Sequence, residues 1–122
     1  MRFIVLVKTA ESSAPPKEFM EAMQKSSEEA TKAGTLVATG GLAPIAMGTR
    51  LRVSGGKLIV TDGPFTEAKE VVASFAELDV KSKEEAIEAG RWLMQMFIDF
   101  WSGWEGEIEI RQILGPADYP QP

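Results

Sequence analysis

The feature that most constrains the fold is a run of five apolar side chains near the start of the chain, at residues 3–7. Successive side chains of a strand point to opposite faces of its sheet, so a strand that is apolar at every position must be covered on both faces. We therefore expect a central strand, with helices over one face of its sheet. A second sheet, packed face to face on the first, would cover the other face.

Two segments have helical periodicity. Residues 17–33 follow a pair of prolines and end at Gly34, which suits a helix C-cap. The second helix begins at a capping box, in which the Ser82 oxygen accepts a first-turn N–H and Glu85 reaches back to the N–H of Ser82. This helix is apolar nearly all round, which predicts cover from its own sheet and from a second subunit. The residues expected on its main apolar face are Ala86, Ala89, Leu93, Phe97, Phe100 and Trp104.

The remaining strands follow from alternation and turn residues. We expect a strand over residues 35–39 that stops at Gly40 and Gly41, a hairpin of residues 49–54 and 57–61 around Gly55 and Gly56, and strands over residues 71–80 and 105–114. The predicted fold class is α+β, a βαββαβ plan with an inserted β-hairpin and both helices on one face of an antiparallel sheet. One domain would cover residues 1–114, and residues 115–122 would form a C-terminal tail.

Composition excludes several classes of protein. The net charge of −5, with 18 acidic against 13 basic residues, disfavours a nucleic-acid partner. The chain has no Cys and no His, which removes thiolate chemistry and the commonest acid–base and metal-binding side chain. We expect no metal and no cofactor, because the sequence has no motif for either. Its most apolar window, residues 92–101, covers about half of the roughly 20 residues that span a bilayer. With no secretory signal, the protein is expected in the cytoplasm.

The strongest candidate site is the corner Thr61-Asp62-Gly63-Pro64-Phe65. Gly63 can adopt backbone angles closed to other residues and Pro64 fixes its own φ, so Asp62 is held on a stiff bend. A partly buried Asp62 would suit a general base or a ligand contact. The alternative is an Asx-turn, in which the carboxylate accepts a backbone N–H from Phe65 or the next residue and only builds the corner.

Other candidates surround this corner. Arg50 and Arg52 share one face of the hairpin and could grip a carboxylate, or could simply guard an edge strand. Lys69 is a candidate for an anionic substrate, whereas Glu67 and Glu70 suit either a cleft rim or a solvated surface. Phe65 is expected to anchor the turn in the core as well as to border the ligand. The three tryptophans, Trp92, Trp101 and Trp104, suit ligand stacking or, more commonly, a core or an interface.

The sequence resembles the YCII-related family, specifically the branch named for its Asp-Gly-Pro-Phe signature, here Asp62 to Phe65 followed by Glu67, Lys69 and Glu70. Further matching stretches are residues 1–8, 32–34, 40–42, 50–52, 55–57, 60–70, 81–86 and 105–112, so the resemblance covers nearly the whole chain. It implies a ferredoxin-like fold that dimerises into an α+β barrel, with a cleft in each subunit near the signature. The chain departs from the branch over residues 91–104, where a short loop is usual.

The resemblance implies no single activity. Some members of the wider family carry a His and Asp pair proposed as an active site, and relatives by fold include lactone isomerases and monooxygenases, but this chain has no His to form that pair. Members of the branch tend to be encoded beside sigma factors of the extracytoplasmic-function type.

Three hypotheses follow. The first is a homodimeric protein that binds a small organic molecule beside Asp62, with Arg50, Phe65, Glu67 and Lys69 as ligand contacts. The second is a cofactor-free isomerase, lyase or oxygenase with Asp62 as its acid or base. The third is an interaction module for a sigma factor.

Overall fold

The computed structural model describes residues 1–10, 14–63 and 70–120. The elements are the strands β1 (Arg2–Thr9), β2 (Leu36–Gly41), β3 (Thr49–Ser54), β4 (Lys57–Asp62), β5 (Val71–Asp79) and β6 (Glu107–Gln112), the helices α1 (Lys17–Lys32) and α2 (Lys83–Phe100), and the short 3₁₀ turns η1 (Ile45–Met47) and η2 (Pro116–Asp118).

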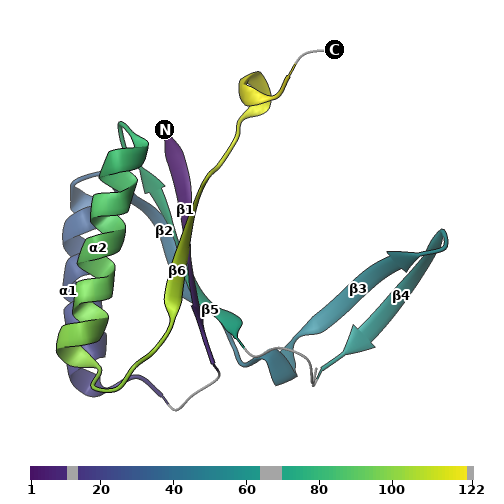
Figure 1. Ribbon diagram of the computed structural model, residues 1–122, viewed down its shortest axis with the longest axis horizontal. Helices are drawn as coiled ribbons and strands as arrows, with labels where there is room; N and C mark the ends of the chain where they lie inside the picture. The colour runs from purple at the N-terminus through teal and green to yellow at the C-terminus, as the bar shows by residue number, and fades with distance from the viewer. Residues whose placement is uncertain (11–13, 64–69, 121–122) are drawn as a thin grey trace.

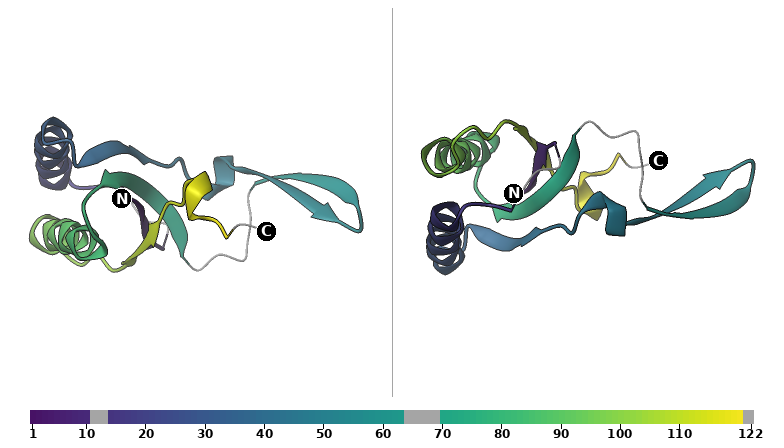
Figure 2. Two further views of the ribbon diagram at one scale, coloured as in Figure 1. Left: turned by 90° about the horizontal axis from the view of Figure 1, so that it is seen from above. Right: turned by 90° about the horizontal axis from the view of Figure 1, so that it is seen from below.

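Four strands form the main sheet in the order β2-β5-β1-β6, and all neighbours are antiparallel. Both helices lie on one face of this sheet (Figure 1), and the views in Figure 2 show them side by side. Apart from the inserted hairpin, each helix connects two strands that are consecutive in the chain and are separated by one strand in the sheet, as a βαββαβ plan requires. The predicted α+β, ferredoxin-like fold is therefore confirmed.

The first strand is central, as its uninterrupted apolar sequence predicts. On the face toward the helices, Phe3, Val5 and Val7 are at most 5% exposed. Ile4 and Leu6 point to the other face and are only half-buried, because α1 and α2 both lie on the opposite face. The strand is apolar on both faces, and the single chain buries only one of them.

We call the uncovered side the open face of the sheet. Residues that pair across strands lie on the same face, so the register assigns to it Ile4, Leu6, Lys8, Phe75, Glu77, Glu107, Glu109 and Arg111.

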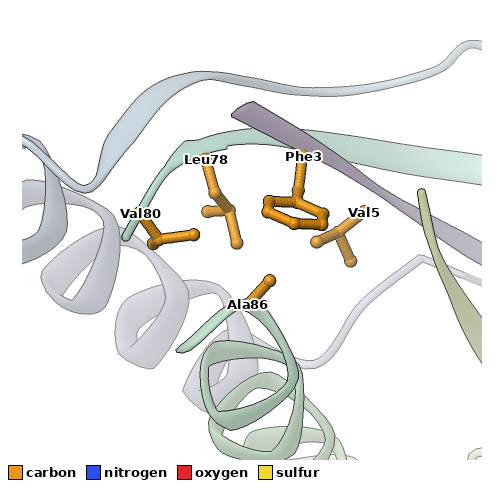
Figure 3. Packing of buried hydrophobic residues seen from close by; sticks show 5 residues of the cluster. All are labelled: Phe3, Val5, Leu78, Val80 and Ala86. Carbon is orange, nitrogen blue, oxygen red and sulfur yellow. The ribbon is translucent and has the colours of Figure 1, made fainter. Parts of the chain in front are cut away.

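The buried core lies between the sheet and the helices. In Figure 3 the methyl group of Ala86 on α2 points toward Phe3, Val5 and Leu78 of the sheet. Ala86 is fully buried, which matches its predicted place on the inner face of the helix. A small side chain here lets the helix approach the sheet closely.

A second cluster joins the ends of the two helices through aromatic rings. The ring centroid of Phe97 lies 4.6 Å from that of Phe19 on α1 and 3.9 Å from that of Trp104. Trp101 stands edge-on to Phe19 at 5.2 Å. Trp101 and Trp104 are partly buried and pack against this cluster, as the core alternative predicts, but both also line the apolar hollow between the helices and the sheet.

Four local predictions are wrong in detail. Gly40 and Gly41 do not stop β2 but belong to it, and a Cβ on Gly40 would lie 3.2 Å from the Phe75 ring. A side chain at residue 40 would therefore require the ring to shift slightly. In the capping box the Ser82 hydroxyl accepts from the N–H of Glu85 at 3.2 Å, but the Glu85 carboxylate accepts from the N–H of Lys81, not of Ser82.

The other two concern the end of α2 and the corner at residues 61–65. Phe100, expected on the apolar face, is 42% exposed, because the helix ends there and the chain turns away before Trp104 returns to the core. Gly63 has no positive φ; the glycines that do are Gly34, Gly55, Gly56 and Gly103.

The predicted hairpin is confirmed and forms a separate two-stranded sheet. Gly55 and Gly56, with φ of 59° and 75°, make its two-residue turn. The hairpin extends away from the main sheet on the side opposite the helices (Figures 1 and 2). Every residue of β3 and β4 is exposed.

Candidate functional site

A hollow of about 1560 Å³ between the helix pair and the sheet has the character of a binding site. Its walls are mainly aliphatic, aromatic and methionine side chains, with few polar groups. Ligand sites in proteins are concave and apolar in this way, with volumes of about 300–1000 Å³, so the hollow is large enough for an organic molecule of ordinary size. The apolar walls include Val7, Met23, Ala30, Leu36, Leu93 and Met96.

One end of the hollow lies where the hairpin joins the body of the protein. Here it is bordered by the small-residue loop of residues 42–45, by Arg50 at the base of β3 and by Glu70 ahead of β5. This end carries the opposite charges of a guanidinium and a carboxylate, whereas the inner walls are mostly uncharged, so an amphipathic ligand would place its polar group here.

Asp62 is not among the residues that line the hollow. It is exposed, and its Oδ1 accepts a hydrogen bond from the hydroxyl of Thr49, its partner at the base of the hairpin, at 2.8 Å. The expected Asx-turn cannot be compared, because its donors at residues 65 and 66 lie outside the described residues. The observed bond closes the open end of the β3–β4 ladder, which is a structural role.

The corner after Asp62 is held by backbone contacts. The N–H of Gly63 donates to the carbonyl of Gly48 at 2.8 Å. A Cβ on Gly63 would lie 2.7 Å from the carbonyl oxygen of Ala46 and 2.9 Å from that of Ile45, closer than a carbon atom can approach. Glycine is therefore required by the close approach of two backbone segments, not by a special φ.

The remaining predicted site residues are placed as follows. Pro64, Phe65, Glu67 and Lys69 lie outside the described residues. Arg52 is exposed on the hairpin and does not line the hollow, whereas Trp92, 68% exposed, lies along it.

The open face of the sheet carries paired charges between its apolar side chains. The Lys8 ammonium lies 2.7 Å from a Glu109 oxygen and 3.7 Å from Glu107, and Arg2 bonds Glu77 at 3.0 Å. The hydrogen bond to Glu109 raises the pKa of Lys8 above its ordinary 10.5, and the same bond lowers the pKa of Glu109 below 4.5. These acids and bases neutralise one another, so they oppose the approach of an apolar surface less than single charges would.

Sequence reasoning centred the site on the corner and missed the inner walls of the hollow. Met20 and Met23 on α1 and Met96 on α2 all line it, and clustered methionines are typical of adaptable apolar binding surfaces. Their presence on both helices was a visible signal, but helical spacing alone does not distinguish a packed core from a hollow.

The described residues also bear on two other roles, metal binding and insertion into a membrane. Across residues 1–10, 14–63 and 70–120, acidic side chains do not gather in threes as a metal site would need. In the same ranges, neither helix has the length and apolar content needed to cross a bilayer.

Comparison with known proteins adds a family but no activity. The model of the YCII-related domain matches residues 1–93. An uncharacterized protein of Rhizobium meliloti is 38% identical over 72 residues, which are 59% of this chain and 56% of that protein. The aligned part thus spans little more than half of the relative. The family match ends within α2, short of the nearly complete coverage expected, although β6 beyond it pairs with β1 and supplies Ile108 and Ile110 to the core.

Proposed function

Because the chain belongs to the YCII-related family, which brings no settled reaction with it, we propose from the geometry that the protein binds a small amphipathic organic molecule in the hollow between its helices and its sheet. The observation that carries this proposal is the apolar hollow of about 1560 Å³ that reaches the base of the hairpin. The apolar body of the ligand lies against the walls formed by the helices, and its polar group faces Arg50. We also assign the chain to the Asp-Gly-Pro-Phe branch on its signature at residues 62–65.

The proposal is tested with two fluorescent probes that share a ring system. Anilinonaphthalene sulfonate carries an anionic group, and N-phenyl-1-naphthylamine is nearly the same molecule without it. Both are expected to bind saturably, because both have the apolar body that the walls accept. Arg50→Ala is expected to weaken binding of the sulfonate by about tenfold, the value of one charged contact of about 1.4 kcal/mol, and to leave the neutral probe unchanged. Arg52→Ala is the matched control, since Arg52 does not line the hollow.

A second pair of variants tests the location. Ala30→Phe places a ring in the hollow and should weaken both probes, whereas Ala22→Phe adds the same ring to α1 at a residue that does not line it. Circular dichroism checks that both variants are folded. Equal effects of Ala30→Phe and Ala22→Phe, or unsaturable binding by the wild type, would show that the probes bind elsewhere and would remove the proposal.

We further propose that two chains associate through their open faces. Two observations support this. Ile4 and Leu6 are apolar side chains of the central strand that the single chain leaves half-covered. The chain also exposes 8930 Å², whereas a compact protein of 13.3 kDa exposes about 6500 Å². Sedimentation at micromolar concentration is expected to give twice the mass of one chain, and a mass of 13.3 kDa at all concentrations would contradict the dimer.

The enzyme and sigma-factor hypotheses stay predictions. The exposure of Asp62 and its bond to Thr49 favour the structural role for this carboxylate over that of a general base.

A further inference from the structure

The β3–β4 hairpin has one face that the described part of the chain leaves exposed. The register places Leu51 opposite Val60 and Val53 opposite Leu58, so these four side chains share one face, which we call the apolar face of the arm. They are between 58% and 75% exposed. The other face carries Arg50, Arg52 and Ile59. An isolated two-stranded hairpin is marginally stable in water, so this face needs a covering surface.

Three observations indicate that the covering surface belongs to a second copy of this chain. The first is position, because the arm extends from the side of the sheet opposite the helices (Figures 1 and 2), which is the side on which the second sheet of the proposed dimer would lie. A partner packed on the open face would therefore lie beside the arm.

The second observation is area. The exposed surface exceeds that of a compact protein of this mass by about 2400 Å², whereas a standard interface covers about 800 Å² on each partner. One ordinary sheet-to-sheet contact leaves much of the excess uncovered. An arm that also packs against the partner accounts for more of it.

The third observation is charge. The arm carries Arg50, Arg52 and Lys57 against the one acid Asp62, a net charge of +2, while the whole chain carries −5. The body outside the arm is therefore at −7. Two arms repel each other, but an arm and the body of a second copy attract, within the screening length of about 8–10 Å in physiological salt.

We infer that the two chains of the dimer exchange arms, the apolar face of each hairpin packing against the body of the other chain. The inference rests on the proposed dimer and adds a second contact to it. Since Arg50 at the base of the arm also borders the hollow, docking of the arm links dimer formation to the polar end of the ligand site.

The absence of cysteine from the chain makes a clean test possible. Ile59→Cys and Val60→Cys place one thiol each at neighbouring residues on opposite faces of the arm, 46% and 58% exposed in the single chain. In the dimer, Val60→Cys is expected to react with a maleimide at least about tenfold more slowly than Ile59→Cys, because reaction requires the arm to undock. On dilution to the monomer, observed by sedimentation, the two rates should converge.

The outcomes separate the two proposals. Equal rates for the two thiols in a sample that sediments as a dimer would overturn arm exchange and leave the dimer intact. A monomer at every concentration would overturn both. A third variant, Val53→Cys, tests which surface the arm meets: packing against the body leaves these thiols apart, so rapid formation of a disulfide-linked dimer in air would show arm-to-arm contact and overturn the exchange.

Discussion

Gly90 tests how tightly α2 packs on the sheet, because two opposing effects can be separated there. In a helix interior, Gly→Ala is favourable by about 1 kcal/mol, since alanine has less backbone freedom to lose. A Cβ at residue 90, however, would lie 2.8 Å from Cδ1 of Ile108 and 2.9 Å from Cδ1 of Ile110. Relieving such contacts in a packed core costs about 1–3 kcal/mol. Gly90→Ala is therefore expected to destabilise the protein by up to about 2 kcal/mol.

The same contact can be relieved from the strand side, by shortening the two isoleucines and leaving the helix unchanged. Ile→Val deletes the Cδ1 methyl group, and at a buried site costs about 0.5–1.5 kcal/mol. In a protein with both Ile108→Val and Ile110→Val, the added methyl of Gly90→Ala meets open space, and the same substitution is expected to stabilise by up to about 1 kcal/mol. We therefore predict that the effect of Gly90→Ala on stability changes sign between the two backgrounds, with a coupling energy of about 1–3 kcal/mol between residue 90 and the two isoleucines.

The assay is urea unfolding of the four proteins in this mutant cycle at one chain concentration, because stability of a dimer depends on concentration. If the effects of Gly90→Ala agree within about 0.5 kcal/mol in the two backgrounds, the glycine is not required by contact with β6 and the packing argument is refuted.

Three further predictions concern other parts of the structure. Phe97→Ala should cost about 3–5 kcal/mol in urea unfolding, since the ring is 5% exposed and joins both helices; a loss under about 1 kcal/mol would contradict its place in the core. Because the pKa of Glu109 is lowered, its charged form stabilises the fold above its ordinary pKa of 4.5, and this contribution disappears as the pH falls. The wild type should therefore lose stability more steeply on acidification than Lys8→Met. Parallel profiles of stability against pH for the two proteins would disprove the pairing. Asp62→Asn should leave the melting temperature nearly unchanged, because an amide oxygen can still accept the hydrogen bond from Thr49, whereas Asp62→Ala should lower it. Equal decreases in melting temperature for the two variants would show that the charge itself matters.

Sequence patterns predicted the elements well where local chemistry decides them. The two-residue glycine turn, the Ser82 cap and the alternation of Ile108 and Ile110 each depend on a few neighbouring residues, and each is present in the structure. The errors occur where a distant segment decides the outcome. Gly40 and Gly41 stay in their strand because they pair with Phe75 and Ser74 of β5, and no local rule for glycine contains that information.

The candidate site shows the same division. The sequence identified Arg50, which borders the hollow, but it centred the site on Asp62, which does not line it. A turn signature reports how the backbone bends, whereas the position of a cavity depends on which side chains from separate elements fail to fill the space between them.

The sequence by itself determined the order of helices and strands, the central place of residues 3–7 and the need to cover both faces of their sheet, because hydrophobic periodicity and turn chemistry act over a few residues. Only the tertiary structure decided that the hollow lies between the helices and the sheet, that Gly63 is fixed by two carbonyl oxygens, and that an apolar hairpin face is left exposed on the side of the open face. These features arise from packing between residues far apart in the chain, and packing is settled only when all the elements are in place.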